Sequence, residues 1–560
     1  MRIRNSIAAV AAALAVIVAC AGSAASQQPT PEPGGATPLG SDVQHLHYRY
    51  GPIHVLPGQN LILIGPVTIE KPAYDGFVTR IKPNLVRADG SVPPVDVIHL
   101  HHGVFLNESR KDATMGGAER FFATGEEKTI FRMPPGYGYP VRGSDVWAVN
   151  YMVHNQTPVA DDVWITYDLD YVPANSALGR TMKPVRPIWM DVRNGEAYPV
   201  FDVHRGAGGA EGKWTYPDNA KDPYGTGRPR NVWTADRNGT LVAAAGHVHP
   251  GGLWDDLTLE RPSAAAAAVA KPAAAKAAAK CKRAAKRKKR HANRSKRKRG
   301  AHGKRARRPA YHCAAATPAP RTSVPILRSM AQYFDPQGPI SWDLAMTGSK
   351  PDWRVPIRKG DRLRVSATYD TERASWYESM GIVVAYMADG LQGPDPFIHP
   401  PDTSGPTTHG HLPENNNHGG GGQGGKDPAT LPDGQTVDNR VGIQGFSYLP
   451  GDQGLPGGFG NPPAITAGKS LTFDNEDASS QIFHTVTACK APCNRATGIS
   501  YPLADGPVQF DSSELGYGPT GFTAAGNRYE WKTPPNLAPG TYTYFCRIHP
   551  YMRGAFRVKP

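Results

Sequence analysis

Three residues near the end of the chain have the types and the spacing of a metal site. Cys546, His549 and Met552 stand at successive intervals of three. A thiolate and an imidazole suit copper in both oxidation states, and a weak thioether ligand tunes its potential. The segments 541–545 and 555–558 on either side are expected to be strands, so the three side chains share one short loop. This pattern favours one-electron transfer at copper.

Residues 461–560 resemble a cupredoxin, because the spacing Cys-x2-His-x2-Met is that of the ligand loop of the amicyanin-like blue copper proteins. The resemblance implies a β-sandwich, a type 1 copper that transfers electrons, and a fourth ligand well upstream, a position that His484 fits. Cys489 and Cys493 follow His484 closely, and we interpret them as a disulfide rather than a second metal site.

The larger body of the chain, residues 42–398, consists of short alternating segments interrupted by Gly and Pro, which is typical of β-sandwiches and jelly rolls. It carries three groups of histidines, which are His99-Leu100-His101-His102, His154, and His247-Val248-His249. His247 and His249 are two apart on an expected strand, so both rings face one side, within reach of one ion. Because neutral imidazoles bind copper or zinc, these groups predict further metal in the body.

The order of these groups resembles the copper type II, ascorbate-dependent monooxygenases, which hydroxylate peptidylglycine or dopamine and have two jelly-roll domains with one copper each. The resemblance implies two ligand sets, one of His101, His102 and His154 and one of His247, His249 and Met380. It implies that the first copper stores an electron, and that the second activates O2 and abstracts hydrogen from a C–H bond. His99 shares a strand face with His101, so the pair His99 and His101 remains an alternative to the adjacent pair.

Several features of those monooxygenases are missing. No cysteine lies between Ser41 and Ser263, so the structural disulfides of that family are absent. The peptide hydroxylases bind the substrate with an Arg and a Tyr, and the matching positions are Ala245 and Val384. A glycine-extended peptide is therefore not the expected substrate. The motifs His-Leu-His-His-Gly and Gly-His-Val-His are more similar to those of the stress-up-regulated, Nod19-like plant proteins and their bacterial relatives.

We expect an all-β chain with two jelly-roll domains, similar in fold to the peptidylglycine hydroxylases, a C-terminal cupredoxin sandwich, and disordered insertions. The expected domains are a first jelly roll at 42–180, a second at 181–398, a Gly/Pro/His-rich linker at 399–460 and the cupredoxin at 461–560. With 61 Gly and 54 Pro among 560 residues, an all-helical protein is excluded. The long linker predicts a cupredoxin that docks and leaves rather than staying fixed.

The net charge of +15 comes from one segment. Residues 271–308 hold 19 of the 63 Lys and Arg residues and no acidic residue, which leaves 44 basic against 48 acidic residues elsewhere. This tract belongs to a low-complexity insertion at 263–320, which is expected to be disordered. Contact with polyanions and a solvated insertion without a dedicated partner both remain open, and no specific nucleic-acid role is expected.

Residues 1–26 are typical of a signal peptide, with Arg2 and Arg4 before an apolar run. The segment ending at Cys20 resembles a bacterial lipobox, so lipidation of Cys20 and cleavage near Ser26 both remain open, and residues 27–41 then form a flexible tether. The protein is expected outside the cytoplasm, secreted or anchored to the envelope. No later apolar run reaches the length of a membrane helix.

The leading hypothesis is therefore an exported copper protein, whose type 1 domain passes electrons to or from a monooxygenase-like body with up to two further coppers. The sequence does not indicate the substrate or the redox partner. Two alternatives remain: a non-enzymatic copper-binding or redox shuttle protein of the envelope, and a structural envelope protein that binds polyanions through the basic tract.

Overall fold

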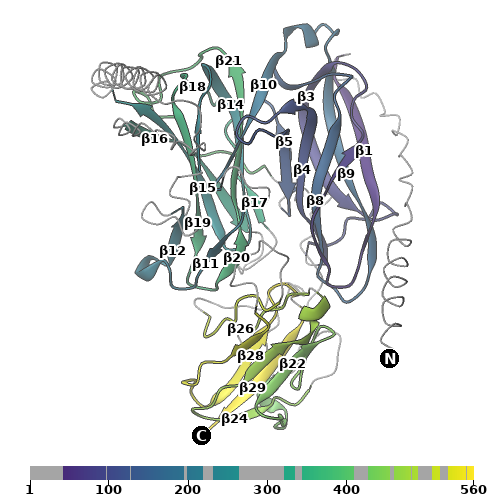
Figure 1. The fold of residues 1–560 in the computed structure, drawn as a ribbon, viewed down its shortest axis with the longest axis vertical. Helices are drawn as coiled ribbons and strands as arrows, with labels where there is room; N and C mark the ends of the chain where they lie inside the picture. The colour runs from purple at the N-terminus through teal and green to yellow at the C-terminus, as the bar shows by residue number, and fades with distance from the viewer. Residues whose placement is uncertain are drawn as a thin grey trace, which may run out of the picture.

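The computed structural model is almost entirely β-sheet and describes most of the body and the C-terminal region. The described residues are 42–95, 97–126, 128–193, 199–217, 231–263, 321–333, 344–408, 427–453, 460–480, 482–489, 508–516, 528–549 and 551–560. Within them the helical elements are short 3-10 turns at Gly179–Thr181, Gly209–Glu211, Pro428–Thr430 and Glu476–Ser480. The expectation of an all-β fold with several sandwiches is confirmed (Figure 1).

Several sequence predictions fall outside the described residues. These are the signal peptide with Cys20, the tether, the insertion from residue 264 to 320 with its basic tract, the Gly-rich segment 409–426 and Cys493. In the part of the chain that is described, no helix has the length and apolar character needed to cross a membrane.

The first sandwich packs two sheets around one apolar core. One sheet has the order β1 (Gln44–Val55), β9 (Asp161–Pro173), β3 (Gly76–Val86) and β7 (Tyr137–Val141), with β6 (Phe131–Arg132) paired to β3. The other has the order β2 (Asn60–Ile69), β8 (Trp147–Asn155), β4 (Ile98–Lys111) and β5 (Ala118–Gly125). Alternate residues of β9, such as Val163, Ile165 and Tyr167, are buried in this core, because side chains of a strand alternate between its faces.

The second sandwich continues the first without a break in the sheet. One of its sheets contains β10 (Lys183–Asp191), β21 (Gly381–Asp389), β14 (Gly239–Val248) and β18 (Val355–Ile357). The facing sheet contains β12 (Lys213–Tyr216), β19 (Arg362–Asp370), β15 (Gly252–Pro262), β16 (Arg321–Tyr333) and β17 (Leu344–Met346), and β13 (Val232–Thr234) also pairs with β19. A separate two-stranded sheet consists of β11 (Phe201–Val203) and β20 (Trp376–Ser379). Parallel pairing of β10 with β7 joins the two sandwiches through one nine-stranded sheet.

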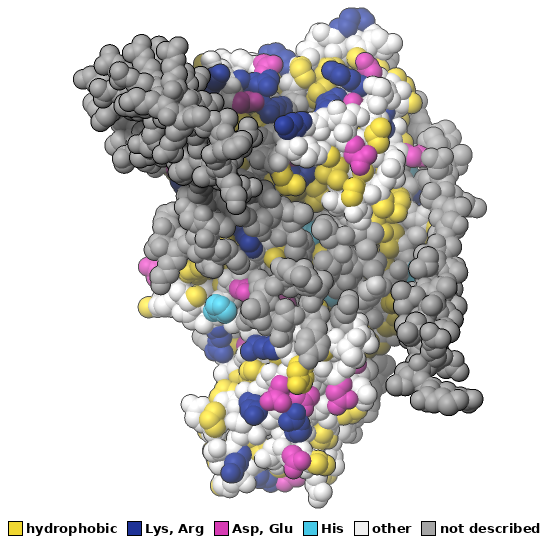
Figure 2. Space-filling model, viewed as in Figure 1, with side chains coloured by type: hydrophobic (Ala, Val, Ile, Leu, Met, Phe, Trp, Pro, Cys, Tyr) yellow, Lys and Arg dark blue, Asp and Glu magenta, His cyan; other side chains and the backbone are white. Residues whose placement is uncertain are grey.

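The third sandwich is the C-terminal one. Its sheets are β23 (Ser447–Leu449), β22 (Arg440–Gln444), β25 (Thr472–Asn475) and β27 (Glu530–Lys532), and β24 (Ala464–Thr466), β29 (Arg553–Lys559), β28 (Gly540–Phe545) and β26 (Thr487–Cys489). The strands β22 and β23 lie in the range for which the sequence suggests a linker, and β22 pairs with β25. Figure 2 shows basic and acidic side chains intermixed on the visible face of this sandwich.

One end of the third sandwich is docked against the body (Figure 1). The guanidinium of Arg547 donates to the carbonyl of Ser375 at 3.0 Å and lies over the ring of Trp376, 4.8 Å from its centroid. The amide of Ser375 donates in turn to Asp511 at 3.0 Å. Phe545 is fully buried in the core of the second sandwich. These buried contacts describe a seated domain, in contrast to the loosely tethered one that the long linker predicts.

Candidate metal centres

Three of the four side chains predicted as ligands in the C-terminal sandwich converge on one point. The sulfur of Cys546 lies 3.7 Å from Nδ1 of His549 and 3.8 Å from Nδ1 of His484, and the two Nδ1 atoms are 3.1 Å apart. All three side chains are buried, and Cys546 is a free thiol. Met552 is buried in the same core. Two imidazoles and a thiolate in this arrangement match the trigonal ligand set of a blue copper centre.

The loop that carries these residues is fixed by its own backbone. Cys546, the first residue after β28, donates its amide to the carbonyl of Met552 at 3.1 Å, and Met552 donates to His549 at 2.9 Å. The amides of Thr485 and His549 both donate to the sulfur of Cys546 at 3.3 Å. Hydrogen bonds to a ligand sulfur tune the potential of a blue copper site, so these two amides would tune a copper held by Cys546.

The pKa of the thiol also suits metal binding. Burial raises the pKa of the Cys546 thiol, but the His484 ring and the two amides lower it by more. The net pKa is therefore below its ordinary value. On the far side of the ring, Nε2 of His484 is 3.0 Å from a carboxylate oxygen of Asp477. A carboxylate on the outer nitrogen orients a ligand histidine, so Asp477 directs Nδ1 toward the sulfur. Local sequence spacing gave no sign of this residue.

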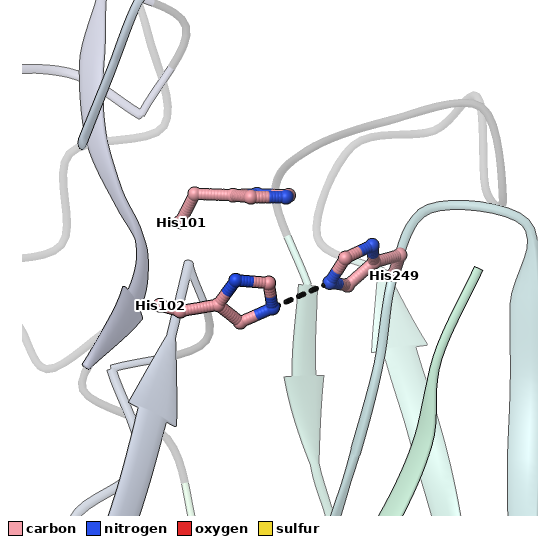
Figure 3. Close-up of side chains that lie close together, drawn as sticks. All are labelled: His101, His102 and His249. Carbon is pink, nitrogen blue, oxygen red and sulfur yellow. Dashed lines mark hydrogen bonds between the residues drawn. The ribbon is translucent and has the colours of Figure 1, made fainter. Parts of the chain in front are cut away.

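A second candidate centre lies where the two body sandwiches face each other. The ligand atoms of His101, His102 and His249 lie within 4.8 Å of one another, and the Nε2 atoms of His102 and His249 are 2.7 Å apart. Figure 3 shows His101 and His102 on one side of this interface and His249 on the other, with the three rings close together. The ring of His247 is 5.2 Å from the rings of both His102 and His249.

A β-bulge explains how two adjacent residues reach the same point. Side chains of consecutive residues in a regular strand point to opposite faces. The register of β4 on β8 shifts between Leu100 and His102, so that an extra residue, His101, is accommodated in β4. The bulge turns His101 and His102 toward the same side, where His249 directly follows the end of β14.

The remaining histidines of the body extend this group. The ring centroid of His99 is 5.7 Å from that of His101 and 5.2 Å from that of His154, and His101 and His154 are 6.4 Å apart. A carboxylate oxygen of the buried Glu126 lies 3.4 Å from Nδ1 of His101. Glu126 is a further residue that the sequence patterns did not indicate, because it becomes a neighbour of His101 only through the pairing of β4 with β5.

The grouping of the histidines differs from the two separate sets expected from the sequence. The structure combines His101 and His102 with His249, since the sheet that contains β4 packs against the sheet that contains β14. His154 lies nearer to His99 than to His101. Met380 is buried beside His102 in the wall of a shared cavity. The role of each residue as a ligand stays a prediction.

Burial keeps these imidazoles in the form that binds metal. It lowers the pKa of His99 to about 4, and it lowers the pKa values of His101, His102 and His154 well below the ordinary 6.5. The neutral ring is the form that coordinates a metal ion, so protons compete little at neutral pH. The residues present therefore fit copper at both centres.

Comparisons with known proteins do not assign the chain to a family. No family model matches the sequence, and no curated protein matches it. Among solved structures, it is similar to a copper-containing nitrite reductase (NirK) from Thermus scotoductus SA-01, at 14% identity and a TM-score of 0.15. The match covers 39% of this chain and 49% of that chain, so this chain spans about half the length of the reductase.

Replacing the buried thiol tests the C-terminal centre. We expect Cys546→Ser to abolish the intense blue absorption of the copper-loaded chain, because that colour requires a thiolate bound to copper. Visible absorption spectra before and after copper addition measure this. Thr543→Ser, three residues earlier on β28, is the matched control and should keep the colour. A blue Cys546→Ser protein would contradict the assignment.

Removing one imidazole from the body tests the second centre. We expect His102→Ala and His249→Ala each to lower the copper bound per chain while leaving the blue absorption unchanged, because the two centres use different residues. Metal analysis of the purified chain measures the copper. His54→Ala removes an exposed histidine of β1 that is paired with Asp162, and serves as the control. An unchanged copper content in both cluster variants would argue against a metal site there.

The buried histidines predict that acid destabilises the metal-free chain. Between pH 6.5 and about 4, the unfolded chain protonates a residue such as His99 while the folded chain does not. The unfolded state then binds more protons, so the free energy of unfolding falls as the pH falls through this window, by about 1.4 kcal/mol for each unit of pKa difference. Denaturant titrations of the metal-free chain at several pH values measure this, and a flat profile would contradict it.

Proposed function

We propose that the chain is an exported copper-dependent oxidoreductase. In this proposal the C-terminal sandwich holds a type 1 copper. The body histidines hold copper at which O2 oxidises an organic substrate. Copper bound at the two sites would supply one-electron redox chemistry and, in the body, reactivity toward O2. Hydroxylation of a substrate C–H bond consumes one O2, two electrons and two protons, and yields the alcohol and one water.

One contact carries this proposal. The ring of His549, a predicted ligand of the C-terminal copper, lies edge-on to the ring of His154 in the body, with centroids 6.0 Å apart. His549 is fully buried, so this ring faces the body rather than solvent. The contact joins the two sets of histidines through a single ring-to-ring step. An electron held at the C-terminal site therefore has a short route into the body.

The contact is held in place by packing around it. Phe446 of the C-terminal sandwich lies 5.2 Å from the ring of His549, again edge-on. Gly58, in the loop between β1 and β2, approaches so closely that a Cβ there would lie 2.2 Å from the ring of Phe446. The backbone of Gly58 also forms a hydrogen bond with His549. The contacts among Gly58, Phe446 and His549 therefore fix the position of the third sandwich relative to the first at this point.

Oxygen uptake by the copper-loaded chain tests the proposal. We expect O2 consumption with ascorbate as electron donor, and we expect His102→Ala to lose it while it keeps the blue absorption. Copper bound without O2 consumption would support a redox shuttle instead. Zinc in the body, or one copper in total, would contradict the oxidoreductase.

A change at Gly58 separates electron exchange from copper binding. Gly58→Ala pushes a methyl group into Phe446, and a displacement of about 1 Å can slow a positioned reaction by about 100-fold. We therefore expect the blue colour of the ascorbate-reduced protein to return at least about tenfold more slowly after mixing with O2, with an unchanged spectrum. Stopped-flow absorption measures this rate.

Gly90→Ala is the matched control for this variant. Gly90 also has a positive φ, of 82°, but no atom lies within 4 Å of an added Cβ. If both variants behave alike, backbone strain rather than the interface is responsible, and the proposed route is contradicted.

A further inference from the structure

We propose that a cavity beside His102 binds a small, uncharged, mainly apolar molecule as the substrate of the histidine centre, an inference that rests on the proposed function. The cavity has a volume of about 170 Å³ and lies between the two body sandwiches. Its wall includes Val104, Leu106, Met152, Trp189, Met380 and Ile382.

The cavity opens directly onto the centre. His102 contributes to its lining, and Nε2 of His102 is the atom 2.7 Å from Nε2 of His249. A molecule in the cavity therefore lies against an imidazole of the cluster. Met115, which is 39% exposed, also lines the cavity and marks an approach from solvent at the β4–β5 connection.

One hydroxyl ties the wall of the cavity to the histidines. The hydroxyl of Tyr369 donates to the carbonyl of Met380 at 2.6 Å and accepts from the amide of Met380 at 3.0 Å. The same oxygen accepts from the amide of His249 at 3.1 Å. The position of Met380 in the wall is thus fixed relative to His249, so the cavity is preorganised next to the centre.

The charge of the cavity excludes an ionic ligand. Among the described residues that line it, the one charged side chain is Arg120, whose guanidinium is bound to Asp112 at 2.9 Å and 3.1 Å and lies 3.5 Å from Asp191. The same guanidinium lies over the ring of Trp189, 4.7 Å from its centroid. A carboxylate substrate would have to displace Asp112 from a buried ion pair, and an ammonium substrate would face a guanidinium. Burying an unpaired charge is costly, so the apolar wall selects a neutral molecule.

The volume sets the size of that molecule. An apolar cavity of about 150 Å³ holds benzene. A cavity of 170 Å³ therefore fits one six-membered ring with a small substituent, and it is too small for a peptide. This agrees with the absence of a peptide-binding Arg and Tyr at Ala245 and Val384.

Calorimetric titration with toluene and with benzoate tests the inference, since the two probes have similar size and differ in charge. We expect toluene to bind the full-length, copper-loaded chain and the metal-free chain, and benzoate to bind at least tenfold more weakly. Toluene should also change the electron paramagnetic resonance signal of the body copper and leave the signal of the type 1 copper unchanged. Equal or tighter binding of benzoate, or no binding of toluene, would overturn the inference.

Variants that fill the space locate the binding site. Met152→Phe and Leu106→Phe add ring volume from β8 and β4, and each should weaken toluene binding at least tenfold while the blue absorption persists. Met330→Phe, at a partly exposed position of β16, is the control. Toluene binding at the original strength in both folded cavity variants would overturn the inference. Toluene binding by the metal-free chain does not depend on copper. If the body binds no copper, the proposed function is contradicted, but the toluene titration still tests whether the cavity binds a neutral molecule.

Discussion

The parallel pairing of β7 with β10 is the constraint on which the rest of the body depends. It makes one sheet run through both sandwiches and so fixes the face that each presents to the other. His102 and His249 are 147 positions apart in sequence, and they meet because of this shared sheet. The burial that comes with this packing also lowers the pKa of His102, so its ring is neutral at neutral pH. Fold, protonation state and ligand geometry thus have one common origin.

The ligand loop of the C-terminal sandwich has two roles at once. Cys546 lies in the predicted metal site with His484 and His549, whereas its neighbours Phe545 and Arg547 contact the body. Docking and the predicted coordination therefore use consecutive residues of one short segment. A shift of this sandwich relative to the body would be transmitted to the thiolate through a single peptide bond on each side.

The sequence predicted those parts of the protein that depend on local spacing. Alternation and the Gly/Pro content were sufficient for the all-β fold, and Cys546 and His549 stand in one loop whose spacing is visible by inspection. His484 required the resemblance to cupredoxins. The union of His101 and His102 with His249 could not be predicted, because it depends on a bulge in β4 and on contact between sandwiches. Glu126 and Asp477 were missed for the same reason, since carboxylates near a site carry no pattern of their own.

The bulge at His101 makes the strand unable to slip by one position without turning its imidazoles away from β14. The register of β4 and the assembly of the predicted centre are therefore coupled. A chain in which β4 is out of register would not bring His101 and His102 next to His249. The metal content of a preparation would then report the fraction of molecules in which β4 has its native register, as distinct from compact molecules in which β4 is paired in a shifted register.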